Sequence, residues 1–142
     1  MLSPQIHSPI YQIFDEAFNH GNLAVVDELL SPDHFAHSTF GRAPNGPQGL
    51  KLLIVIFRTA FPDLHCIVED EIREGDNFSA RLTLRGTQQG PFMGNPPTGK
   101  QVSVQGLIFG RTVDGKVVED WTLIDQLGIL VQLSLVPPSS AN

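Results

Sequence analysis

The sequence is poor in cysteine and in long apolar runs. Its 142 residues include a single cysteine, Cys66, which allows no internal disulfide and no cysteine-based metal cluster. The longest uninterrupted apolar run, residues 52–57, is far shorter than the roughly 20 residues that cross a bilayer. Residues 1–9 lack both the basic and the apolar region of a signal peptide. We therefore expect a cytoplasmic protein with no membrane association.

Positive charge is also scarce. Nine Lys and Arg side chains stand against 15 Asp and Glu, which gives a formal net charge of -6 at pH 7, and the basic residues do not cluster. Nucleic-acid binders need a basic stripe along the phosphate backbone, so we expect no nucleic-acid partner. The 41% apolar content suits one globular domain, which we place at residues 1–136, followed by a flexible tail at residues 137–142.

The first half of the chain predicts three short helices. Apolar residues repeat at helical spacing in residues 9–20, 22–30 and 47–61. Ser8 and Pro9 form a typical helix start, Asn22 can cap the second helix, and Pro62 ends the third. The segment at residues 33–49, rich in His, Gly and Pro, is expected to form a loop.

The second half has the period of two that is typical of strands. Four strands are expected at residues 65–73, 77–87, 102–113 and 116–125. Asp114-Gly115 between the last two strongly predicts a hairpin turn. A short final strand or a turn is expected at residues 127–135.

This order of elements predicts an α+β domain, in which about three N-terminal helices cover one face of a curved antiparallel sheet. Three short helices cannot fill a strongly curved sheet of four long strands. We therefore expect a pocket between the two layers, and we place the function there.

A set of short motifs from residue 61 onward carries a family resemblance. They are Phe61-Pro62-Asp63-Leu64, Gly75-Asp76, Arg81, Gly86-Thr87, Gly90, Phe92, Pro97-Thr98-Gly99-Lys100, Asp114-Gly115-Lys116, Glu119, Trp121, Asp125, Leu127-Gly128 and Gln132-Leu133. With these motifs in this order, roughly residues 6–133 resemble the SnoaL-like polyketide cyclase family of the nuclear transport factor 2-like superfamily. The resemblance implies a cone-shaped, cystatin-like α+β barrel that forms a homodimer or homotetramer and binds a hydrophobic multi-ring small molecule.

The resemblance also implies a reaction, which is intramolecular aldol ring closure without metal or organic cofactor. An aspartate near the end of the hairpin's second strand acts as acid and base in the family, and Asp125 stands at the matching position. Two positions depart from the family: Gln88 stands where relatives often carry histidine, and Arg111 stands where cyclases place a histidine before the hairpin turn. Ring hydroxylation, or binding without catalysis, therefore stays open as an alternative.

The last long strand has two faces, only one of which lines the pocket. One face carries Val117, Glu119, Trp121, Leu123 and Asp125, and the other carries Val118, Asp120, Thr122 and Ile124. If the first face lines the pocket, Asp125 sits in an apolar row where loss of solvation makes a carboxylate a stronger base. The alternative is that Asp125 ends the strand and caps the following turn.

The hairpin register decides which side chains share the face of Asp125. A two-residue turn at Asp114-Gly115 puts Val104 opposite Asp125, whereas a three-residue loop puts Ser103 there. We favour the three-residue loop, because it places two polar residues of the preceding strand in the pocket.

Those two residues are Gln105 and Arg111, which we expect to contact substrate. Arg111 either stabilises an enolate oxygen or binds a substrate carboxylate, and its alternative role is an ion pair with Glu119. Arg81 either orients a carboxylate in the pocket or is solvated. Trp121 either contacts the ligand or belongs to the core.

His34 and His37 lie three residues apart in the expected loop, which is poor metal-ligand spacing without further partners, so we expect no metal site. His37 either donates to a substrate oxygen at the cavity mouth or is a partly exposed loop residue. The leading hypothesis is a cofactor-independent acid/base enzyme, in which Asp125 removes a proton from a hydrophobic carbonyl compound and returns it to the new alkoxide. A small-molecule binding module and a structural homodimerisation domain are the alternatives.

Overall fold

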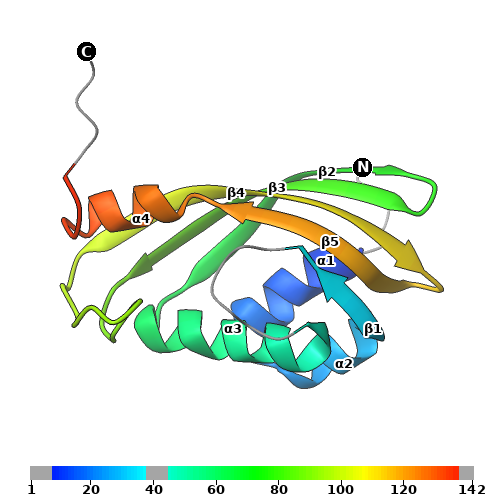
Figure 1. The fold of residues 1–142 in the computed structure, drawn as a ribbon, viewed down its shortest axis with the longest axis horizontal. Coiled ribbons are helices and arrows are strands. Elements are labelled where there is room, and N and C mark those ends of the chain that lie inside the picture. The colour runs from blue at the N-terminus through cyan, green and yellow to red at the C-terminus, as the bar shows by residue number, and fades with distance from the viewer. Residues whose placement is uncertain (1–7, 38–44, 138–142) are drawn as a thin grey trace, which may run out of the picture.

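The chain folds into two layers, a curved five-stranded sheet and a group of helices on one side of it (Figure 1). The computed structural model describes residues 8–37 and 45–137. In chain order the elements are α1 (Pro9–Gln12), the π-helical segment η1 (Ile13–Phe18), α2 (Ala24–Leu29), β1 (Leu30–Ala36), α3 (Gly46–Ala60), β2 (His65–Glu74), β3 (Asn77–Thr87), β4 (Gln101–Val113), β5 (Lys116–Ile124) and α4 (Gln126–Gln132). Figure 1 shows α1, α2 and α3 together beneath the sheet, which confirms the predicted α+β architecture.

The N-terminal helices begin and end mostly where the sequence predicts. Ser8 caps α1, because its side chain accepts a hydrogen bond from the backbone N–H of Tyr11. The same helical segment continues as η1, whose wider π turns the apolar spacing did not predict. The predicted cap at Asn22 is wrong, since α2 starts after Leu23 without a side-chain cap. The predicted third helix is confirmed as α3.

The sheet has the strand order β1-β5-β4-β3-β2. The four predicted strands are confirmed as β2 to β5, and they pair antiparallel in sequence order. The fifth strand, β1, lies where a helix end and a loop were expected, and it pairs parallel with β5. Pro32 concealed this strand, because proline is tolerated in a sheet only at an edge or a bulge, and β1 is an edge strand.

The β4–β5 hairpin is closed by a two-residue turn. Asp114 and Gly115 both have positive φ, 51° and 78°, and Val113 pairs directly with Lys116. The expected three-residue loop is therefore wrong. The register then shifts within the hairpin, because Thr112 pairs with Val117 whereas Arg111 pairs with Glu119.

This shift is a β-bulge that leaves one extra residue, Val118, in β5. Beyond the bulge the backbone N–H of Asp125 donates to the carbonyl of Gln105, so Asp125 faces neither Val104 nor Ser103. Side chains alternate between the two faces of a strand. The extra residue Val118 therefore moves every later side chain of β5 to the face opposite the one it would occupy in a regular hairpin.

The inner face of the sheet forms one core with the helices. Along β4 every second residue is buried and the residues between them are exposed, so only one face of this strand is covered. Core residues from both layers include Phe14, Phe18, Ile54, Phe57, Leu82, Val104 and Ile108. We call the opposite, uncovered side the outer face.

The C-terminal segment at residues 127–135 contains a helix, α4, rather than the expected strand or turn. Ile129 and Leu133 of this segment are buried. Pro137 is the last described residue, so residues 138–142 of the tail expected at 137–142 lie outside the described part of the chain. Among the helices of the described residues, none has the length and apolarity needed to cross a membrane.

Candidate functional site

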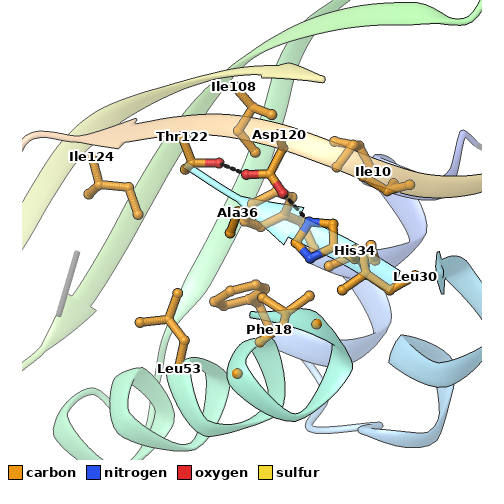
Figure 2. A pocket seen from close by; sticks show the side chains of 16 residues that line it. Ile10, Phe18, Leu30, His34, Ala36, Leu53, Ile108, Asp120, Thr122 and Ile124 are labelled. Carbon is orange, nitrogen blue, oxygen red and sulfur yellow. Dashed lines mark hydrogen bonds and ion pairs between the residues drawn. The ribbon is translucent and has the colours of Figure 1, made fainter. Parts of the chain in front are cut away.

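A small cavity lies between the inner face of the sheet and the N-terminal helices (Figure 2). Its volume is about 110 Å³, and its wall comes from α1, η1, β1, α3, β4 and β5. Pockets for drug-sized ligands have volumes of roughly 300–1,000 Å³, whereas an engineered cavity of about 150 Å³ holds one benzene ring. The predicted pocket between the layers is therefore present, with room for about one ring.

The wall of the cavity is apolar except at one place. Of the 16 residues that line it, only His34, Asp120 and Thr122 carry polar side chains, and only His34 and Asp120 can titrate. Nε2 of His34 lies 2.6 Å from Oδ2 of Asp120, and Thr122 Oγ1 donates to Asp120 Oδ1 over 2.7 Å. The side chains of His34 and Asp120 are 4% and 16% exposed, so the pair is held largely out of water.

Two features of the sheet assemble this group. The bulge at Val118 turns Asp120 and Thr122 to the inner face, across from the inward row of β4. The parallel pairing of β1 with β5 sets Ala36 beside Asp120, and His34 lies two residues earlier on the same face of β1. Figure 2 shows His34 reaching Asp120 from below the sheet, with Leu53 and Phe18 on the opposite side of the cavity.

Asp125 lies outside the cavity, so its expected place in the pocket wall is wrong. It is exposed, and its Oδ1 accepts a hydrogen bond of 2.8 Å from the backbone N–H of Gly128 at the start of α4. Asp125 thus ends the strand and caps a helix, as the alternative interpretation held. Its carboxylate is exposed to solvent, so the apolar surroundings expected to make Asp125 a stronger base are missing.

The expected pocket positions of Gln105, Arg111, Arg81 and Trp121 are also wrong, because none of them lines the cavity. Gln105 and Arg111 lie among the exposed residues of β4, on the outer face. Arg111 pairs with Glu119 at 3.5 Å, as its alternative role required. Arg81 forms an ion pair with Asp70, and its own side chain is 42% exposed.

Trp121 and His37 belong to a second cluster, on the outer face. The imidazole of His37 stacks on the indole of Trp121 with ring centres 4.3 Å apart, and its Nε2 lies 2.8 Å from Oε2 of Glu119. The hydrogen bond with His37 is the main reason that the pKa of Glu119 is lowered. His34 faces inward from β1, whereas His37, the residue after β1, faces outward, so the two imidazoles lie on opposite sides of the sheet and cannot share a metal ion.

Two further polar residues of the sequence are structural. Gln88 is fully buried, donates through Nε2 to the carbonyl of Gly90, and accepts through Oε1 from the backbone and hydroxyl of Thr98. It therefore holds the loop that follows β3, away from the cavity. Burial raises the pKa of the Cys66 thiol to about 12, which keeps it protonated and unsuited to nucleophilic chemistry.

The sequence pattern does not reveal His34 and Asp120 as site residues, for two different reasons. Asp120 was recognised on the second face of β5, but the sequence held no signal for the bulge that turns this face inward. His34 falls in a segment whose Gly, Pro and His content predicts a loop, although the burial of His34 between the exposed Asp33 and Phe35 is the pattern of a two-faced strand.

Comparison with known proteins places the whole described fold in one family. The model of the SnoaL-like polyketide cyclase family matches residues 8–133. The nogalonic acid methyl ester cyclase of Streptomyces nogalater is 34% identical over 121 residues, covering 82% of this chain and 89% of the relative. The aklanonic acid methyl ester cyclase DnrD of Streptomyces peucetius is 30% identical over 123 residues, covering 83% of each chain.

Solved structures agree with this assignment. AclR from Streptomyces galilaeus, a candidate hydroxylase, superposes with a TM-score of 0.80 at 32% identity, covering 93% of this chain and 82% of AclR. IdmH from Streptomyces antibioticus, a candidate polyketide cyclase, gives a TM-score of 0.77 at 35% identity, covering 89% of this chain and 96% of IdmH. Sequence and fold together show that this chain belongs to the SnoaL-like polyketide cyclase family.

Proposed function

We propose that this protein catalyses the intramolecular aldol cyclisation of a hydrophobic, polyketide-like carbonyl compound, with the Asp120–His34 pair as its acid/base group. The observation that carries the proposal is the carboxylate of Asp120, bonded to an imidazole in the wall of an otherwise apolar cavity. Proton abstraction next to a carbonyl needs a base that is held in reach of the substrate, and the pair holds such a group in the cavity wall. Family membership, with two methyl ester cyclases at 30% identity or more, favours ring closure over other acid/base reactions.

The size of the cavity limits how the substrate binds. A volume of about 110 Å³ receives one ring or the reacting end of a larger molecule. We therefore propose that the carbon that loses its proton enters the cavity, while the other rings of the substrate stay at its mouth.

The first turn of α3 supports the negative charge that develops on an enolate. Gly46 and Gly49 of this turn line the cavity, and among the residues that the structure describes no side chain makes a capping hydrogen bond to this helix start. Unpaired backbone N–H groups and the helix dipole favour anions at such a start. We assign this helix start the role expected of Arg111, which lies on the outer face.

The experiment compares the activities of variants at Asp120 and Asp125, the two aspartates near the C-terminal end of β5. Nogalonic acid methyl ester, the substrate named for the 34% identical relative, is incubated with purified wild type, Asp120→Asn and Asp125→Asn. We expect Asp120→Asn to lose at least about 100-fold in kcat/KM, in line with the contribution of a general acid/base group. Asp125→Asn should stay within about threefold of wild type, because asparagine caps a helix as well as aspartate does.

The mass of the product separates the alternatives. Cyclisation rearranges the substrate without changing its mass, whereas the hydroxylation suggested by the likeness to AclR adds an oxygen atom. An oxygenated product, or a loss of activity confined to Asp125→Asn, would overturn the proposal. Binding of the ester without turnover would instead favour a binding module.

We also propose that two copies pair through the outer face to form a homodimer. Phe35, Leu107, Phe109, Trp121 and Leu123, which we call the outer patch, are 41–65% exposed. Leu107 pairs with Leu123 and Phe109 with Trp121 across β4 and β5, so the patch is continuous. Monomers rarely expose a large apolar patch, and two sheets pack well face to face about 10 Å apart.

A cytoplasmic location and a single functional domain remain part of the proposal. Cys66 is a free, buried thiol, which suits a reducing compartment. The family match over residues 8–133 supports one domain for the described part of the chain.

A further inference from the structure

Within the described part of the chain, one nitrogen of the His34 imidazole has no hydrogen-bond partner. Its Nδ1 is buried and makes no hydrogen bond with any residue that the structure describes, although Nε2 is bound to Asp120. In Figure 2 this second nitrogen points away from Asp120, into the space between the sheet and α3. Buried polar atoms are nearly always paired, so an unpaired one in a cavity wall calls for a ligand partner.

The oxygens of Asp120, in contrast, are already engaged. Oδ2 contacts His34 and Oδ1 accepts from the hydroxyl of Thr122. An ionised Asp120 can only accept a hydrogen bond, so Nε2 of a neutral His34 is the donor and keeps its proton, and Nδ1 then carries the lone pair of the ring. No other titratable side chain is among the residues that line the cavity. Nδ1 is therefore the basic atom of the pair that remains free to meet a substrate.

We infer that Nδ1 of His34 is the atom that takes and returns the substrate proton, and that Asp120 is a positioning residue. This inference rests on the proposed function and names the group that performs its chemistry. Asp120 fixes the tautomer and the orientation of the ring, and its charge stabilises the imidazolium that forms. The logic is that of an Asp–His pair in which the carboxylate does not itself become protonated.

The proton balance of the reaction closes on this one atom. The C–H bond next to the substrate carbonyl breaks, its proton moves to Nδ1, and its electron pair forms the enolate. The enolate carbon then attacks the second carbonyl carbon, whose C–O electron pair moves onto oxygen as an alkoxide. The alkoxide takes the proton back from Nδ1, so His34 ends neutral and no oxidant or cofactor is consumed.

The first test uses the protein without substrate. Long-range ¹H–¹⁵N spectra of ¹⁵N-labelled wild type near neutral pH report which ring nitrogen of His34 carries the proton, and the resonances are assigned by their loss in His34→Gln. We expect the proton on Nε2 and a bare Nδ1. A neutral ring with its proton on Nδ1 would overturn the inference, because that atom would have no lone pair for a substrate proton.

The second test separates a base from a donor that only orients Asp120. The glutamine of His34→Gln still offers an N–H to Asp120 but cannot accept a proton at neutral pH. We expect it to lose at least about 100-fold in the exchange of the ester's α-hydrogen for solvent deuterium, followed by ¹H NMR. His65→Gln, an exposed histidine at the start of β2, is the matched control and should exchange as wild type does.

The outcomes distinguish the inference from the function on which it rests. Exchange that depends on His34 but yields no ring closure would remove the cyclase function and keep His34 as the base. Exchange in His34→Gln within about tenfold of wild type, with the variant folded by circular dichroism, would overturn the inference and return the role of base to Asp120. If wild type neither exchanges nor cyclises the ester, the tautomer measurement decides.

Discussion

Filling the cavity should stabilise the protein and abolish its turnover. Ala36 lines the cavity from β1, beside the pair formed by His34 and Asp120, and its short side chain leaves space in front of it. Replacing Ala36 with leucine adds three carbons to this space. The cavity of about 110 Å³ exceeds the volume of those carbons, so the new side chain can be accommodated without moving the sheet.

The expected magnitude follows from apolar burial. Each buried methylene contributes about 0.8 kcal/mol, so three carbons give at most about 2.4 kcal/mol. Imperfect fit offsets part of this gain, and we expect a net increase of about 1–2 kcal/mol in the free energy of unfolding. For a chain of 142 residues the entropy of unfolding is about 0.3 kcal/mol/K, so this increase raises Tm by about 3–7 °C. A substrate ring would lose its place beside His34, and kcat/KM should fall by at least about 100-fold.

Ala24→Leu is the control, because Ala24 is exposed on α2 and the same three carbons would stay in water. Calorimetry gives Tm for both variants, and turnover of nogalonic acid methyl ester gives kcat/KM. A stabilised Ala36→Leu with normal turnover would place the substrate elsewhere. A less stable Ala36→Leu with Ala24→Leu unchanged would show that the cavity is not free space.

Two further predictions concern the outer face and the acid range. Leu123→Arg should convert a dimer into monomers in sedimentation experiments, because a two-fold interface brings the two new charges together. Val55→Arg, at an exposed position of α3, is the control and should leave the dimer intact. Equal effects of the two substitutions would refute the interface. The pKa of Asp63 is lowered chiefly by the backbone N–H of Thr87, so its stabilisation is present above the unfolded pKa of about 3.9 and lost as pH falls through the folded value. Asp63→Asn should therefore lower the urea midpoint at pH 7 but progressively less below pH of about 3.9, and a difference independent of pH would contradict this.

Most of the fold could be predicted because its signals are local. The apolar spacing of α3, the alternation along β3 and the turn residues Asp114-Gly115 each act over a few neighbours, and the structure has all three. The fifth strand, β1, could not be predicted in the same way. Its pairing with β5 joins segments more than 80 residues apart, and Pro32 argues locally against a strand.

The composition of the outer patch explains why the sequence predicted the wrong pocket-lining face of β5. Trp121 and Leu123 are large and apolar, so their face of β5 resembled a core face, yet it is exposed in the chain alone. A sheet face that packs against a second copy carries the same composition as one that packs against helices. The sequence pattern cannot distinguish the two.

The sequence by itself determined the fold class, the hairpin turn and the presence of two aspartates, Asp120 and Asp125, near the end of one strand. Only the tertiary structure decided which aspartate enters the cavity. The physical reason is the bulge at Val118, because one extra residue reverses the alternation of side chains and turns Asp120 inward and Asp125 outward. The parallel pairing of β1 with β5 then brings His34 to Asp120, a contact between residues 86 positions apart that no local pattern encodes.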